Sequence, residues 1–96
     1  MKTPRLSRHH MIPKSRAGEF PGMDNNHPNN IKMVSNEVHR AWHRMFYNML
    51  PNEAYLAVQF LSHLWKTRDY FIVFNSRSPE DAANLIQNEW TPNVER

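Results

Sequence analysis

The chain has 96 residues and a mass of 11.5 kDa, which leaves room for one small domain over residues 1–96. It contains no cysteine, so neither disulfides nor cysteine-ligated zinc can stabilise the fold. No apolar run reaches the roughly 18 residues of a membrane helix, and no apolar stretch follows the basic N-terminus as in a secretory signal. We therefore expect a cytoplasmic protein without a membrane partner.

The net charge of +3 is unevenly distributed along the chain. Residues 1–44 carry eight Lys or Arg against three Asp or Glu, whereas residues 45–96 carry four against six. Five of the six histidines also lie in the first 44 residues. This asymmetry favours an anionic partner for the front half, with nucleic acid as the first candidate. A solvated basic surface is the alternative explanation.

The first half of the chain is predicted to form an open hairpin. A short strand ends at the adjacent pair His9-His10, shortly before Pro13. Residues 14–29 are rich in Gly, Pro, Asn and Ser, and a surface loop of that length is usually functional or disordered. Residues 30–34 contain three apolar side chains and predict a second strand. Two short strands around one long loop make the hairpin.

Helices are predicted to follow. Ser35 or Asn36 can cap the first helix, whose apolar residues recur at helical spacing until Pro51 ends it. A second helix from about residue 52 to 66 is apolar around most of its circumference, and we expect it to be the most buried element.

The last third of the chain contains one further helix and an ambiguous apolar run. Residues 70–74 read YFIVF, which has the composition of a strand or of a buried extended segment. The pair Ser78-Pro79 is a good helix start, and this helix should end before Pro92. The predicted fold class is α+β and mostly helical.

Four histidines and one asparagine form a pattern that none of them makes alone. His9 and His10 are adjacent, Asn30 opens the second strand, and His39 follows nine residues later. His43 lies four residues after His39, on the same face of a helix. Each feature by itself has an ordinary explanation, such as an exposed histidine pair or turn chemistry. Their order and spacing together call for a functional one.

The segment RHHMIPKSRAG…NNIKMVSNEVHRAWH resembles the HNH endonuclease motif, which folds as a ββα-metal unit. The resemblance covers residues 8–43, and residues 44–96 would form a helical C-terminal extension. This sequence departs from the family in three respects. His9 stands where Asp is frequent, Ala17-Gly18 replaces the frequent Gly-Gly, and the structural cysteine pairs of many members are missing.

The resemblance implies a metal-dependent endonuclease that hydrolyses phosphodiester bonds of nucleic acid, with DNA as the expected substrate. His10 would be the general base, oriented by Asn30. His9, His39 and His43 would hold one divalent metal ion and leave a coordination position open, as in catalytic sites. Imidazole ligands favour Zn, Ni or another transition metal, while Mg or Mn stays open.

Basic side chains around the motif are expected to hold the backbone phosphates. They are Arg8, Lys14, Arg16, Arg40 and Arg44.

Two other readings stay open at this point. The chain can be a non-catalytic nucleic-acid-binding module on the same fold with a structural metal, or a helical interaction protein with incidental histidines. His27 is expected to be a loop residue, with a role as an extra ligand or base as the alternative, and His63 a polar edge of the second helix. The sequence gives no oligomeric state.

Overall fold

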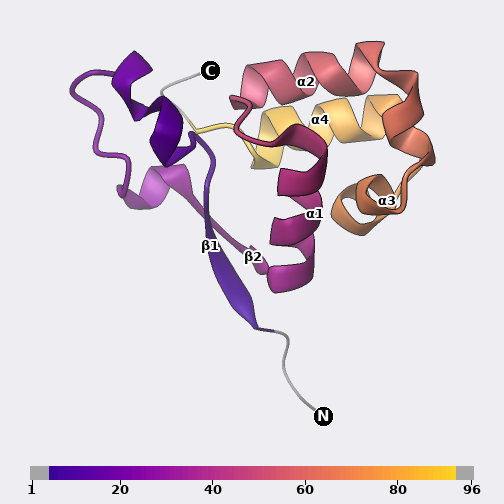
Figure 1. Ribbon diagram of the computed structural model, residues 1–96, viewed down its shortest axis with the longest axis horizontal. Coiled ribbons are helices and arrows are strands. Elements are labelled where there is room, and N and C mark those ends of the chain that lie inside the picture. Colours follow the sequence, from indigo (N-terminus) through magenta and orange to yellow (C-terminus); the bar gives the residue numbers. More distant parts are fainter. Residues whose placement is uncertain (1–4, 93–96) are drawn as a thin grey trace.

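The computed structural model describes residues 5–92 and confirms the α+β class: an antiparallel hairpin is followed by a group of helices (Figure 1). The elements in chain order are β1 (Leu6–His10), the 3₁₀ helices η1 (Lys14–Glu19) and η2 (Pro28–Asn30), β2 (Ile31–Ser35), α1 (Asn36–Phe46), α2 (Pro51–Phe60), the 3₁₀ helix η3 (Ser62–Lys66), α3 (Arg68–Phe74) and α4 (Pro79–Glu89). None of the helices within residues 5–92 is long and apolar enough to cross a bilayer.

The predicted hairpin is confirmed. β1 and β2 pair antiparallel, with His9 opposite Lys32 and His10 opposite Ile31. Because neighbouring side chains on a strand point to opposite faces, His9 and His10 leave the hairpin in different directions. His9 is buried against the helices, whereas His10 lies at the partly exposed end of β1.

The helix after the hairpin starts where the sequence predicts. The Ser35 hydroxyl caps α1 by accepting a hydrogen bond from the Val38 N–H at 3.1 Å, and Glu37 lies in the first turn, where a negative charge is favoured. Its apolar stripe, including Trp42 and Phe46, is buried in the core. The direct continuation from β2 into α1 keeps the start of the helix next to the hairpin.

The helices form two packed pairs beside the hairpin. α1 packs against α3, and α2 packs against α4 (Figure 1). The rings of Trp42 on α1 and Trp90, which follows α4, stack in parallel with centroids 4.1 Å apart. The start of α4 at Pro79 with Ser78 as its cap is confirmed, as is its end before Pro92. Thus the last helix, although remote in sequence, reaches the hairpin side of α1.

The predicted helix over 52–66 is shorter and less buried than expected. α2 ends at Phe60, and the chain turns at Leu61 into η3. This turn brings Leu64 into the core, while Leu56 and Phe60 remain 49% and 77% exposed. Only one side of α2 packs against α4, so an all-round apolar sequence does not make it the most buried element.

Both the strand and the buried extended segment considered for residues 70–74 are wrong, because this segment is helix α3. The Thr67 hydroxyl accepts a hydrogen bond from the Tyr70 N–H at 3.2 Å and starts the helix. Asn75 ends it in a left-handed conformation, with φ 50° and ψ 38°. Tyr70 and Phe74, one helical turn apart, are both buried, whereas Phe71 is 44% exposed. The burial therefore follows the helical period within an apolar run.

Candidate metal centre

Three histidines from two elements converge on one point, as the sequence predicts. β1 supplies His9, while His39 and His43 lie one turn apart on α1. One ring nitrogen of each lies within 4.8 Å of the corresponding atoms of the other two. Such a group has the size and donor chemistry of a metal site, because imidazole is the commonest protein ligand for transition metals.

His9 is the most constrained member of this group. Its residue is 1% exposed, and both ring nitrogens are buried without a hydrogen-bond partner among the described residues. Its ring packs edge-on against the stacked rings of Trp42 and Trp90, with centroid distances of 5.5 and 5.1 Å. Burial, followed by the nearby His43 and His39, lowers the pKa of His9 to about 3. His9 is therefore a neutral imidazole with a free lone pair at neutral pH.

The two helical histidines present their Nε2 atoms to each other at 3.0 Å. The Nδ1–H of His43 donates a hydrogen bond to the Tyr47 carbonyl oxygen at 3.0 Å, which leaves the Nε2 lone pair available. Burial, together with the neighbouring His43 and His10, lowers the pKa of His39. The hydrogen bond fixes the tautomer of His43, and the lowered pKa favours the neutral ring of His39, the form that binds a metal.

The arrangement fits a tetrahedral metal ion on chemical grounds. Two nitrogens bound to zinc at about 2.0–2.1 Å lie roughly 3.3 Å apart, close to the separation found between His39 and His43. A bound ion would also give one of the two partnerless nitrogens of His9 an acceptor for its lone pair. Three protein ligands leave a fourth position open.

The two helical histidines border a surface hollow. A surface hollow of about 470 Å³ is lined by His39 and His43 together with Arg40, Arg44 and Tyr47. His9, in contrast, closes the inner side against the two tryptophans. A ligand can therefore approach the histidines from the α1 side.

The candidate base His10 lies beside this group. It follows His9 in the chain, and its charge contributes to lowering the pKa values of both His9 and His39. The His10 Nε2–H donates a hydrogen bond to the Asn26 side-chain oxygen at 2.9 Å. This contact leaves the Nδ1 lone pair of His10 free to accept a proton.

Asn30 has different neighbours from those the resemblance implies. Its side-chain oxygen accepts from the Ile12 N–H at 2.8 Å, and its side-chain nitrogen donates to the carbonyls of Ile12 and Asn25 at 3.1 and 2.9 Å. The side-chain amide that contacts His10 belongs to Asn26. Asn30 therefore fixes the backbone on both sides of the loop, and any effect on His10 passes through that backbone.

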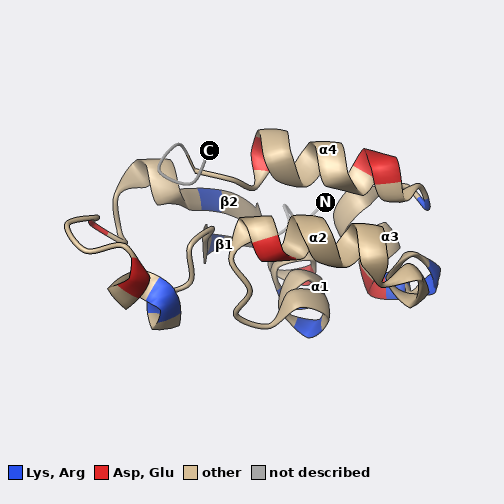
Figure 2. Ribbon diagram, turned by 90° about the horizontal axis from the view of Figure 1, so that it is seen from above, with Lys and Arg blue, Asp and Glu red and all other residues tan. Residues whose placement is uncertain are grey.

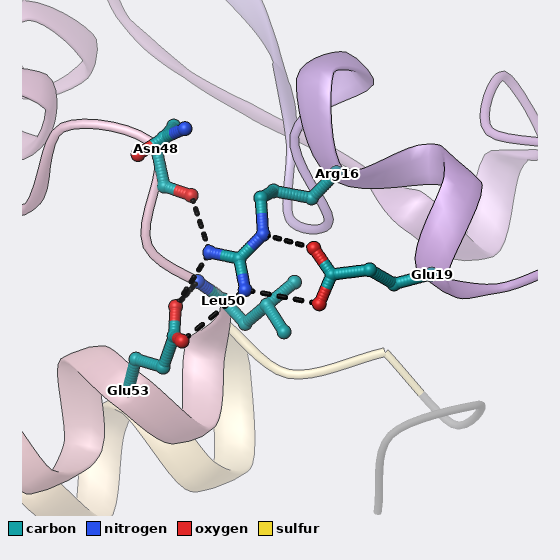
Figure 3. A network of polar contacts seen from close by, with 5 residues as sticks. All are labelled: Arg16, Glu19, Asn48, Leu50 and Glu53. Carbon is teal, nitrogen blue, oxygen red and sulfur yellow. Dashed lines mark hydrogen bonds and ion pairs between the residues drawn. The ribbon is translucent and has the colours of Figure 1, made fainter.

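Arg16 is engaged in an internal network (Figure 3). Its guanidinium contacts Glu19, bonds both carboxylate oxygens of Glu53 at 2.7 and 3.2 Å, and donates to the Asn48 carbonyl at 3.2 Å. The Leu50 N–H also donates to Glu53 at 2.8 Å. These contacts lower the pKa of Glu53, with Arg16 as the main cause. The expected phosphate contact by Arg16 is not supported, because Arg16 joins η1 to the start of α2.

The other residues expected to bind phosphate differ in whether an ion pair already engages them. Arg44 is held by both carboxylate oxygens of Asp69, at 2.9 to 3.1 Å. Arg8, Lys14 and Arg40 are exposed, and none of the three has an ion-pair partner within residues 5–92. Arg40 borders the hollow over the histidines, whereas Arg8 and Lys14 do not line it.

Two residues at this centre are missing from the predictions. Tyr47 supplies the carbonyl that orients His43, and it does so from a strained backbone with φ 54° and ψ −121°. Trp90 covers His9 from the far end of the chain. No spacing rule indicates either one, although the stop of the helix before Pro51 was a signal that a turn lies near Tyr47.

The remaining two histidines lie outside the group. His27 is exposed and caps η2, since its Nδ1 accepts a hydrogen bond from the Asn29 N–H at 3.1 Å. His63 is exposed in η3. Comparisons with models of protein families, with curated proteins and with solved structures found no match to this chain.

Proposed function

We propose that this chain is a metal-dependent endonuclease of the HNH type that hydrolyses phosphodiester bonds in DNA. The observation that carries the proposal is His9: a buried imidazole with two partnerless nitrogens faces His39 and His43 within 4.8 Å. The ββα order of the elements around these residues agrees with the resemblance of residues 8–43 to that motif.

The chain's own residues have separate tasks in this proposal. His9, His39 and His43 would hold one divalent ion, with Zn or Ni favoured by the three imidazoles. When bound, such an ion neutralises charge on the phosphate and on the leaving oxygen. His10 accepts a proton from the attacking water at Nδ1, while Asn26 holds its Nε2–H. Arg40 holds phosphate oxygens at the edge of the hollow.

The decisive experiment separates the ligands from the base. Plasmid nicking is measured with Mg, Mn, Ni and Zn added one at a time, together with metal stoichiometry and DNA affinity. His10→Ala should keep the metal and the affinity but lose cleavage by about 10²–10⁴-fold, the usual effect of removing a general base. His39→Ala should lose both metal and cleavage. His63→Ala, an exposed histidine in η3, is the matched control and should behave as wild type.

Three results would contradict the proposal or parts of it. Equal cleavage by wild type and His10→Ala would remove His10 as the base, with His27 the next residue to test. Unchanged metal stoichiometry in His39→Ala would remove the ligand assignment. Wild-type protein that binds metal and DNA yet cuts with none of the ions would favour the non-catalytic binding module.

A further inference from the structure

A second hollow adjoins the one over the histidines. The second hollow has a volume of about 530 Å³ and lies between α1 and α3. It is lined by Glu37, Arg40, Arg44, Arg68, Asp69 and Ile72. Because Arg40 and Arg44 line both hollows, the two are neighbours along α1, and together they are called the groove below.

α1 builds one wall of this groove with two parallel rows of side chains. His39 and His43 form one row, and Arg40 and Arg44, each one residue further, form the other. Residues four apart on a helix lie about 5–6 Å from each other on one face. The arginine row therefore runs beside the histidine row and faces the second hollow, where Arg68 stands on the opposite wall.

Two of the three guanidinium groups that line the groove form no ion pair with a described residue. Asp69 is neutralised by Arg44, whose guanidinium bonds both of its carboxylate oxygens. Neither Arg40 nor Arg68 has an ion-pair partner within the described part of the chain, although Glu37 lies in the same hollow. Three arginines against two carboxylates give the groove a local charge of +1.

The position of Arg68 brings no benefit to the helix that carries it. Arg68 is the first residue of α3, where the helix dipole disfavours a positive charge. Its side chain is exposed, so it contributes no core packing either. A guanidinium held on a groove wall is suited to bidentate contact with phosphate oxygens.

The acidic surface lies elsewhere. Figure 2 shows the Asp and Glu of α4 on the opposite side of the molecule from the basic edge of α1. α4 carries three carboxylates, from Glu80, Asp81 and Glu89, and no Lys or Arg. The carboxylates of α4 therefore lie away from the α1 side, where the groove opens.

On these grounds we propose that the groove between α1 and α3 binds the phosphate backbone of the substrate strand next to the cleaved bond, with Arg40 and Arg68 as the phosphate ligands. The inference rests on the proposed nuclease function and extends it beyond the hairpin and first helix. It makes α3, outside residues 8–43, part of the substrate-binding surface.

The test compares two equal charge reversals in neighbouring positions. A short fluorescein-labelled DNA duplex is titrated by anisotropy at several salt concentrations, in a His10→Ala background that prevents cutting. Arg68→Glu should weaken binding about tenfold at low salt and reduce the slope of log K against log salt by about 1. Lys66→Glu changes the charge by the same amount, but Lys66 does not line the groove and should alter affinity less than twofold.

The outcomes separate this inference from the proposed function. Equal effects of Arg68→Glu and Lys66→Glu, with tight binding by the parent, would overturn the groove and leave the nuclease proposal standing. Failure of the parent to bind DNA at any salt concentration would overturn both. If Arg68→Glu does not fold, as judged by circular dichroism, Arg68→Gln removes the same phosphate contact without reversing charge, and an unchanged slope in that variant overturns the groove.

Discussion

Both polar atoms of the Asn30 side chain form hydrogen bonds with backbone groups. It bonds the N–H and carbonyl of Ile12 and the carbonyl of Asn25, and it is 2% exposed. Buried polar groups left without a partner cost about 1–3 kcal/mol each. A side chain in this position therefore acts on the stability of the loop that carries Asn26 and hence on His10.

Replacing Asn30 tests whether it is a positioning residue. Asn30→Ala should lower the free energy of unfolding by about 2–4 kcal/mol, because it leaves the Ile12 and Asn25 groups unpaired. Asn26→Ala, at an exposed site, should change stability by less than about 0.5 kcal/mol but reduce cleavage, since it releases His10. Urea unfolding and nicking of both variants check this. Equal stability of the two would show that Asn30 has no structural role.

Tyr47 stores strain in the backbone next to the histidines. Its φ of 54° and ψ of −121° belong to the first central position of a type II′ turn, which normally requires Gly. The Met49 N–H donates to the Phe46 carbonyl at 2.9 Å and closes this turn. The conformation directs the Tyr47 carbonyl to the Nδ1–H of His43. Strain of this kind is typical of functional sites.

Relief of that strain should stabilise the protein without harming the site. Tyr47→Gly is expected to raise the free energy of unfolding by about 1 kcal/mol, the net of the lost strain and the greater freedom of the unfolded Gly. Metal affinity should be kept, because the orienting carbonyl belongs to the backbone. Tyr47→Ala also removes the ring but keeps the unfavourable φ, so it should not be stabilised. Denaturant unfolding of Tyr47→Gly and Tyr47→Ala measures both free energies. A stabilised Tyr47→Ala variant would contradict the strain at this position.

At the level of elements, the sequence predicts the structure correctly where helix caps, prolines and nearby residues determine it. Caps and prolines locate α1 and α4 because Ser35 and Ser78 bond the first turn of their own helices. The resemblance of residues 8–43 to the HNH motif predicts the cluster, and a hairpin followed directly by a helix fixes the relative positions of the histidines. These parts depend on neighbours within a few residues or on one simple supersecondary unit.

The parts that sequence reasoning misses depend on tertiary contacts or on overlooked caps. The YFIVF run has strand composition, yet Thr67 and Asn75 cap it as a helix, a signal present in the sequence. The break of α2 at Leu61 has no Gly or Pro to mark it, and it follows from the burial of Leu64. Likewise, only the tertiary fold reveals that Trp90 covers His9.

The link between η1 and α2 gives a prediction about two arginines of equal charge. Arg16 is held by Glu19 and Glu53, whereas Arg40 borders the hollow without an ion-pair partner among residues 5–92. Arg40→Gln should reduce the slope of log K against log salt for DNA binding by about 1. Arg16→Gln should leave that slope unchanged and instead loosen η1, which is seen as faster proteolysis of the loop. If Arg16→Gln reduced the slope as much as Arg40→Gln does, Arg16 would also be a phosphate ligand.

For the whole molecule, the histidine centre couples the hairpin to the last helix. His9 projects from β1 against the stacked rings of Trp42 on α1 and Trp90 after α4, so a charge on its ring affects the packing of all three residues. Besides the other histidines, the cation facing it is Lys32 of β2, which also lowers its pKa. Protonation of this one side chain is therefore linked to global unfolding.

The metal-free protein should lose stability as the pH falls below neutrality. Burial lowers the pKa of His9 from its usual 6.5 to about 3, so the unfolded chain binds a proton that the folded chain does not. The contribution of neutral His9 is complete above pH 6.5 and is lost as the pH falls towards 3. The free energy of unfolding should decrease by about 1.4 kcal/mol per pH unit in this window.

Urea unfolding in EDTA at pH 7 and pH 5 measures this loss, and a His9→Gln variant isolates it. Glutamine does not titrate, so the variant should show a pH dependence smaller than that of wild type by about 2 kcal/mol over the interval. The comparison uses the difference between two pH values in each protein, so any uniform destabilisation by the substitution cancels. Identical pH dependence in both proteins would mean that His9 is accessible to protons in the folded state, and the buried position of its ring against the two tryptophans would be wrong.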